Sequence, residues 1–162
     1  MSDMRMENDN RNNPLETEIA IFAGGCFWHM EEAFQKLDGV STVYAGYTGG
    51  LMKNPTYQQV VSHATDHLEA IEVHYDPNEI TYNELLEHFW KNANPAESAI
   101  FYTSDEQKEL AERSRKYIDK RIGKVTKIAA ATTFYQAEEE HQDYYQKNGF
   151  ACLVNKVWRL GK

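Results

Sequence analysis

The apolar positions of this chain follow two spacings, one typical of strands and the other typical of helices. An uninterrupted apolar run covers 19–23, and over 68–75 apolar residues alternate with others, as in a strand with one buried face. Over 27–37 and 82–90 the apolar residues instead recur at helical spacing, as on the buried face of a helix. Strands that alternate with helices, without an internal repeat, predict an α+β fold with one sheet and helices packed on it.

The remaining elements are marked by capping and turn residues. Thr81 and Glu84 have the spacing of a capping box, and Ser104 is placed to cap a second long helix. Residues 46–56 contain three glycines and Pro55, so we expect a long ordered loop there. The predicted strands are 18–23, 40–45, 68–75, 98–102 and 124–131, and the predicted helices are 27–37, 56–62, 81–94, 104–121 and 138–147.

The chain is long enough for one domain with a substantial core. Of its 162 residues, we expect 1–17 to form a disordered tail, because they are polar and lack periodicity. Residues 18–162 are then expected to form a single domain.

Charge and hydropathy narrow the function classes. The formal net charge of −8 argues against a nucleic-acid partner, which requires clustered Lys and Arg side chains. The basic residues between 113 and 121 alternate with acidic ones and predict a solvated helix face. Residues 1–13 lack the apolar core of a signal peptide, and no apolar run approaches the roughly 18 residues of a membrane span. We therefore expect a soluble, cytoplasmic protein.

The stretch with the most distinctive chemistry is Gly24-Gly25-Cys26-Phe27-Trp28. An apolar run stops at two glycines and a helical pattern follows, which predicts a strand, a tight turn and a helix. Cys26 would then lie at the helix N-terminus, where unpaired N–H groups and the helix dipole favour a thiolate. The two aromatic rings after it would wall a small apolar pocket beside the sulfur. The alternative is a buried structural cysteine in the same turn, but the paired glycines and aromatics favour a reactive one.

The cysteine count favours thiol chemistry over a structural use. Cys26 and Cys152 are too few for a disulfide framework or a four-cysteine zinc site. The chain also lacks Cys-x-x-Cys, His-Glu-x-x-His and the glycine-rich nucleotide motifs. We expect no metal and no organic cofactor.

A thiolate that acts on an oxidised substrate needs an acid to protonate the departing oxygen. Glu69 is the candidate, because it begins a strand expected to be mostly buried, and burial raises the pKa of a carboxyl. Tyr47 and Tyr57 add hydroxyl groups able to bind that oxygen. The alternatives are an exposed glutamate at a strand end and tyrosines of the core or surface. His141, on a predicted helix among acidic residues, is expected to be a capping or surface histidine.

These motifs, taken together, resemble the peptide methionine sulfoxide reductase A family. The resemblance is colinear from about residue 19 to residue 148, and its most specific block is Gly-Gly-Cys-Phe-Trp. The fold that this resemblance implies is a ferredoxin-like α/β roll, which agrees with the alternation of strands and helices. Further matching blocks are 46–50, 54–57, 67–69, 75–77, 89–90, 98–102 and 140–144.

The resemblance implies a role for each candidate residue. Cys26 matches the family's nucleophile, and Phe27 and Trp28 match the rings that hold the substrate methyl group. Glu69 matches the general acid, and Tyr57 matches one of two tyrosines that hydrogen-bond the sulfoxide oxygen. The implied substrate is the S epimer of methionine sulfoxide, free or within proteins.

A second thiol must then reduce the sulfenic acid that the reaction leaves on Cys26. We expect Cys152 to be this resolving thiol and a thioredoxin-type protein or another thiol to be the final reductant. Gly149 before it would let the tail approach the site. The alternatives are an inert, apolar Cys152 and an external resolving thiol.

The chain departs from the family pattern in one stretch and at two single positions. Residues 91–97 are shorter than the family's segment, so its second tyrosine and an active-site aspartate have no counterpart here. His29 and Asp66 stand where glycines are usual. These departures leave open a degenerate member that binds Met-containing peptides or senses oxidant without catalysis. A papain-like protease is a further rival, because His141 lies far downstream of a Cys-Phe-Trp motif.

Overall fold

A six-stranded mixed sheet forms the centre of the computed structural model, which describes residues 17–118 and 126–148. The strand order is β5-β4-β1-β3-β2-β6, and neighbours are antiparallel except for the parallel pair β4 and β5. An α+β fold with one mixed sheet, as predicted, is thereby confirmed. The strands are β1 (Glu18–Gly24), β2 (Val40–Thr48), β3 (Leu68–Tyr75), β4 (Ser98–Tyr102), β5 (Lys127–Ala130) and β6 (Tyr135–Gln136).

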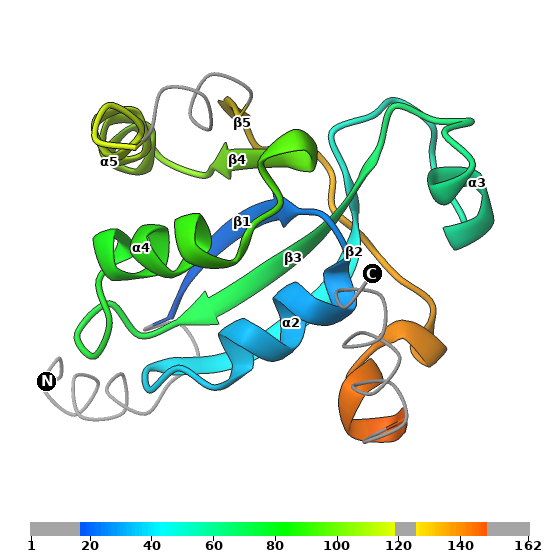
Figure 1. Cartoon of the computed structure of the whole chain (residues 1–162), viewed down its shortest axis with the longest axis horizontal. Helices are drawn as coiled ribbons and strands as arrows, with labels where there is room; N and C mark the ends of the chain where they lie inside the picture. Colours follow the sequence, from blue (N-terminus) through cyan, green and yellow to red (C-terminus); the bar gives the residue numbers. More distant parts are fainter. Residues whose placement is uncertain (1–16, 119–125, 149–162) are drawn as a thin grey trace, which may run out of the picture.

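Helices cover one face of this sheet. Figure 1 shows α2 and α4 crossing in front of β1 and β3, with α5 beyond α4, and α3 standing apart at the opposite end of the molecule. The N-terminus of α2 points toward the end where α3 lies. The α-helices are α2 (Phe27–Gln35), α3 (Tyr57–Val61), α4 (Tyr82–Asn92) and α5 (Asp105–Arg115), and the 3-10 helices are η2 (Pro95–Glu97) and η3 (Glu139–His141).

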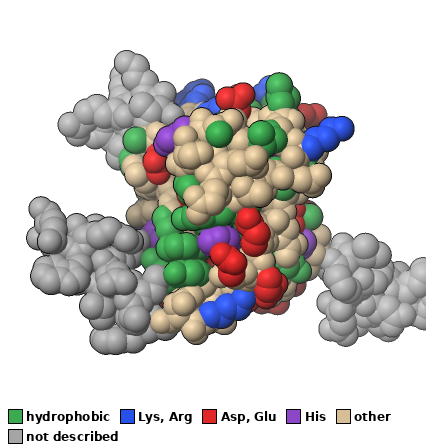
Figure 2. Space-filling view, turned by 90° about the vertical axis from the view of Figure 1, so that its right-hand side faces the viewer, with side chains coloured by type: hydrophobic (Ala, Val, Ile, Leu, Met, Phe, Trp, Pro, Cys, Tyr) green, Lys and Arg blue, Asp and Glu red, His purple; other side chains and the backbone are tan. Residues whose placement is uncertain are grey.

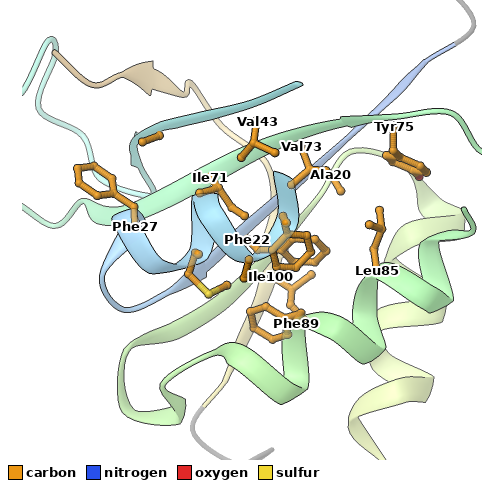
Figure 3. Packing of buried hydrophobic residues seen from close by; sticks show 14 of the residues in the cluster. Ala20, Phe22, Phe27, Val43, Ile71, Val73, Tyr75, Leu85, Phe89 and Ile100 are labelled. Carbon is orange, nitrogen blue, oxygen red and sulfur yellow. The ribbon is translucent and has the colours of Figure 1, made fainter. Parts of the chain in front are cut away.

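The core between the helices and the sheet is built around aromatic rings. Phe22 of β1 is fully buried, and its ring centroid lies 5.4 Å from that of Phe34 and 5.1 Å from that of Phe89. Burial of one such ring stabilises the fold by about 2 to 3 kcal/mol. Figure 3 shows Phe27 at the far end of the same cluster, so the core continues up to the start of α2.

The predicted caps are present and begin the helices where expected. The Thr81 hydroxyl accepts a hydrogen bond from the Glu84 N–H at 3.1 Å, and the Glu84 carboxylate accepts one from the Thr81 N–H at 2.9 Å. The hydroxyl of Ser104 accepts a hydrogen bond from the Gln107 N–H at the start of α5. These bonds satisfy N–H groups that the helices leave unpaired.

Strand β2 runs further than predicted, to Thr48 instead of residue 45. Its last part pairs with β6, which the sequence did not predict, through the partners Gly46 with Gln136 and Tyr47 with Tyr135. A Cβ on Gly46 would lie 2.5 Å from the Phe134 ring, so this glycine permits close packing and does not begin a loop. The loop predicted over 46–56 therefore starts only after Thr48.

The predicted helix over 138–147 is wrong. The segment begins as η3, turns at Asp143, whose φ of 53° lies in the left-handed region, and becomes helical again only over 144–148. The helix expected to reach residue 121 ends at Arg115. The predictions for 1–16, for Cys152 and for part of the strand at 124–131 fall on residues outside the described ranges.

Residues 17–118 and 126–148 contain neither a membrane-spanning helix nor a cluster of metal-binding side chains. No helix there is long and apolar enough to cross a membrane. No group of three or more His, Cys, Asp or Glu side chains there is placed to hold a metal ion.

Candidate active site

Cys26 lies in the turn between β1 and α2. The chain leaves β1 at Gly24, passes through Gly25 with a φ of +95°, and places Cys26 as the N-cap of α2 with an exposed side chain. A Cβ on Gly24 would lie 2.9 Å from the Cβ of Ala93, so this close approach favours glycine. The predicted strand, turn and helix are confirmed, and the thiol stands at the positive end of the helix dipole.

The carboxyl group of Glu69 reaches the same turn from the neighbouring strand β3. Its Oε1 atom accepts a hydrogen bond from the backbone N–H of Phe27 at 3.2 Å. Burial raises the pKa of Glu69, the bond from Phe27 opposes this, and the charge of Glu97 raises the pKa further. The net upward shift agrees with the sequence prediction. A carboxyl group biased toward its protonated form thus lies at the residue after Cys26.

Aromatic rings from three parts of the chain surround the start of α2. We call Phe27, Trp28, Tyr57, His141 and Tyr144 the aromatic cluster. Trp28 stacks on Tyr144 with ring centroids 3.7 Å apart, and Tyr57 stacks on His141 with centroids 4.2 Å apart. Figure 2 faces this end of the molecule, where hydrophobic side chains gather and acidic side chains lie near them. Such a surface suits an apolar group that carries a polar oxygen.

The pKa of Tyr57, the first residue of α3, is affected by charges in and beside the Cys26 turn. Burial raises the pKa of Tyr57, and the negative charges of Glu69 and Cys26 raise it further. The raised pKa keeps the Tyr57 hydroxyl group protonated and therefore able to donate a hydrogen bond. The structure thus brings together three residues that the sequence analysis selected separately.

Tyr47 is buried, and its hydroxyl group is already engaged. It donates a hydrogen bond to Glu138 Oε1 at 2.6 Å, and only 1% of its surface is exposed. The other carboxylate oxygen of Glu138 accepts the backbone N–H of Tyr57 at 3.1 Å. Burial alone would raise the pKa of Glu138, but the hydrogen bonds from Tyr47 and from backbone N–H groups, together with the charge of His141, outweigh it and lower that pKa. Tyr47 therefore supports the position of Tyr57 through Glu138.

His141 is a site residue that sequence reasoning missed. It is 6% exposed, whereas a surface or capping histidine was expected, and its Nδ1 atom accepts the indole N–H of Trp28 at 3.2 Å. His141 is the last residue of the 3-10 helix η3, and it is the buried residue of that helix. The sequence signal that could have indicated a role for His141 was its position in the block 140–144, which resembles the family.

The segment that carries His141 is fixed to the rest of the domain from two sides. The Gln142 side chain accepts the Ala45 N–H at 2.9 Å and donates to the Ala45 carbonyl at 2.8 Å, as a neighbouring strand would. Both carboxylate oxygens of buried Glu31 accept the Asp143 N–H, at 3.0 and 2.9 Å. Burial raises the pKa of Glu31 to about 7, although this hydrogen bond opposes the shift.

The shortened segment 91–97 closes directly onto the Cys26 turn. The Asn94 N–H donates to the Gly24 carbonyl at 2.9 Å, and η2 follows at once. A cavity of about 460 Å³ lies between η2 and α3, with Glu69, Glu97 and Val60 in its wall. Open space thus lies beside Glu69.

Comparisons with known proteins identify similar chains over most of the length. The family model described as peptide methionine sulfoxide reductase matches residues 18–157. The peptide methionine sulfoxide reductase MsrA of Leuconostoc mesenteroides is 45% identical, over 90% of this chain and 95% of its own. The reduced form of Mxr1 from Saccharomyces cerevisiae aligns with a TM-score of 0.74 at 27% identity, over 85% of this chain and 89% of that chain. A structure of Mxr1 in complex with Trx2 aligns with a TM-score of 0.61 at 25% identity, over 82% of this chain and 87% of that chain.

Proposed function

The chain belongs to the peptide methionine sulfoxide reductase family, and we propose that it reduces methionine S-sulfoxide by thiol chemistry at Cys26. The substrate is the free amino acid or the oxidised residue within peptides and proteins. The observation that carries the residue assignment is the contact between Glu69 and the Phe27 N–H, because it holds an acid beside the thiol. A family member that binds sulfoxides without reducing them is not favoured, since the similar chains are reductases by name.

The chemical step moves one oxygen atom from the substrate to the enzyme. The Cys26 thiolate attacks the sulfoxide sulfur, and Glu69 donates a proton to the sulfoxide oxygen as the sulfur–oxygen bond breaks. The attack forms a sulfur–sulfur bond between Cys26 and the substrate. This bond breaks as the hydroxyl group moves to the Cys26 sulfur, so that the oxygen ends on Cys26 as a sulfenic acid and the thioether of methionine leaves with the bonding electron pair. The substrate gains two electrons and Cys26 loses two.

The aromatic cluster orients the substrate for this step. Phe27 and Trp28 hold the apolar methyl group, and the Tyr57 hydroxyl donates a hydrogen bond to the sulfoxide oxygen. The assignment for Tyr57 is supported by the electrostatic influence of Cys26 and Glu69 on its phenol. Tyr47 contributes to binding indirectly, because its hydroxyl group is bonded to Glu138.

The cycle is completed by a second thiol. It attacks the sulfenic acid, releases water and leaves a disulfide, which a further thiol reduces. We assign the attack to Cys152 and the final reduction to a thioredoxin-type protein, and the complex of Mxr1 with Trx2 supports the second assignment. A cytoplasmic location suits this cycle, since thiols are kept reduced there. Residues 18–162 would form the single catalytic domain, after a tail at 1–17.

Turnover of the two sulfoxide epimers with dithiothreitol tests the proposed function. We expect the wild-type chain to reduce methionine S-sulfoxide but not the R epimer. We expect Cys26→Ser to abolish the reaction. Tight binding of a sulfoxide peptide without any product would indicate a non-catalytic binding protein instead. Cleavage of casein would indicate a protease.

A further inference from the structure

We propose that His141 is a positioning residue that fixes the Trp28 ring through its Nδ1 atom, and that protonation of His141 releases this ring. The inference deepens the proposed function, on which it rests, by making one wall of the substrate pocket sensitive to pH. It assigns to His141 no contact with the reacting atoms.

The contacts place His141 between two walls of the aromatic cluster. Its Nδ1 atom accepts the Trp28 indole N–H at 3.2 Å, which links it to α2. Its ring stacks on Tyr57 of α3 at 4.2 Å, with 26° between the planes. The side chain is 6% exposed, so the surrounding rings leave it little room to turn. Loss of the Trp28 bond would therefore change the position of the Trp28 ring relative to the Tyr57 ring.

The chemistry of the bond fixes the protonation state of His141. An indole N–H is only a donor, so Nδ1 must carry no proton, and the proton of the neutral ring lies on Nε2. Both nitrogens of a protonated histidine are donors. The Trp28 N–H would then face another N–H group, and the bond between α2 and η3 would be lost.

The rings that face His141 come from α2, from α3 and from its own segment. From α2 they are Phe27 and Trp28, which do not titrate, and from α3 the phenol of Tyr57. Tyr144 follows His141 in the chain, with its ring centroid 6.4 Å away.

Two carboxylates of the same segment oppose the Trp28 contact. Glu140 lies 3.7 Å from His141 Nε2, and the charge of Glu138 interacts with that of His141. The Trp28 bond requires the neutral ring, whereas a protonated ring would face these two carboxylates. Histidine is the side chain that ordinarily changes charge between about pH 5 and 8.

The indole N–H signals of the full-length chain report this contact directly. In ¹H–¹⁵N spectra recorded from pH 5 to 8, we expect the Trp28 signal to move with pH in the wild type. It should stay fixed in His141→Asn, whose amide oxygen replaces the Nδ1 acceptor and does not titrate. Trp90 is an internal control, because its indole donates to the Ser114 hydroxyl, and Trp28→Phe assigns the signals. A Trp28 signal independent of pH in the wild type, or the same titration in His141→Asn, would overturn the proposal.

Substrate affinity measured in a Cys26→Ser background removes the titration of the thiol from the comparison. We expect a methionine sulfoxide peptide to bind roughly three- to tenfold more weakly at pH 5 than at pH 8, the usual worth of one hydrogen bond. Adding His141→Asn should remove that difference, and adding His141→Leu should weaken binding at both pH values. An unchanged pH dependence with His141→Asn would contradict the proposal. If no variant binds the peptide while the Trp28 signal still titrates with His141, the proposed function fails and the positioning contact stands.

Discussion

Glu69 of β3 accepts a hydrogen bond from the backbone N–H of Phe27 at 3.2 Å, one residue after Cys26. The contact couples the acid to the same helix start that carries the thiol, so neither group can shift without the other. Burial holds the pKa of Glu69 above its usual range despite this bond. A carboxyl group with a raised pKa and an exposed thiol at one helix N-terminus are the acid and the nucleophile that the proposed reduction needs.

Replacing Glu69 with glutamine keeps the shape of the side chain but removes its transferable proton. We expect kcat to fall by about two to four orders of magnitude, the usual worth of a positioned general acid. KM should change much less, because the aromatic cluster remains. Steady-state turnover with dithiothreitol measures both constants, and a mutant within a few fold of the wild type would require another proton donor.

Glu97→Gln is the matched comparison, because Glu97 borders the same cavity and is assigned no role in the chemical step. Its charge raises the pKa of Glu69, so its removal lowers that pKa. Since the protonated form of Glu69 is the active one, activity is lost as the pH rises through its pKa. We expect the pH–rate profile of Glu97→Gln to lose activity at a lower pH than the wild type, with little change in the maximal rate.

Tyr57→Phe removes one hydroxyl group and leaves the stacked ring in place. We expect kcat/KM for the sulfoxide to fall by roughly three- to tenfold, as for one hydrogen bond to a substrate oxygen. Tyr102→Phe, in β4 and outside the aromatic cluster, should match the wild type. Equal activity of the two variants would indicate that a group other than Tyr57 donates the hydrogen bond to the sulfoxide oxygen.

Glu31 makes the stability of the fold depend on pH. Its pKa is about 7 in the folded chain against an ordinary value of 4.5, so the folded state binds more protons between these values, and stability falls as the pH rises through them. At about 1.4 kcal/mol per unit, the loss amounts to roughly 3 kcal/mol at most.

Urea unfolding of Glu31→Gln measures this effect. The variant should lack the decline between pH 5 and pH 8 that the wild type shows. Glu32→Gln, which removes a partly exposed neighbour paired with Lys36, should follow the wild type. A wild-type chain that gains stability over this range would contradict the assignment.

Cys152→Ser separates the chemical step from the recycling step. We expect thioredoxin-supported turnover to be lost and the first release of methionine to be retained, because Cys26 still reacts. Dithiothreitol should restore turnover by attacking the sulfenic acid directly. Normal turnover with thioredoxin would show that the resolving thiol comes from another molecule.

Local signals made the Cys26 turn predictable from the sequence. An apolar run, two glycines and a helical pattern are all contained within 19–37, and the capping box at Thr81 is equally local. The pairing register of the strands is not local, and it places Glu69 opposite Tyr47 between β3 and β2. Both residues could be selected from the sequence, but their positions relative to Cys26 could be determined only from the folded structure.

The segment 138–145 was not predictable because its conformation depends on distant partners. A regular helix satisfied the sequence pattern, but buried Glu31 holds the backbone of Asp143 in a left-handed turn, and Gln142 pairs with β2. These contacts, made across more than 90 residues of sequence, direct His141 into the aromatic cluster. Tyr47 was likewise selected as a substrate contact, whereas the structure engages its hydroxyl group with Glu138.

A single turnover without reductant tests the central assignment, that Cys26 receives the oxygen of the substrate. One equivalent of methionine S-sulfoxide is added to the reduced Cys152→Ser chain, and the products are followed by mass spectrometry. The account predicts about one methionine per chain and one added oxygen atom on the peptide that contains Cys26, with neither product in Cys26→Ser. Release of methionine without modification of Cys26, or equal release by Cys26→Ser, would contradict it.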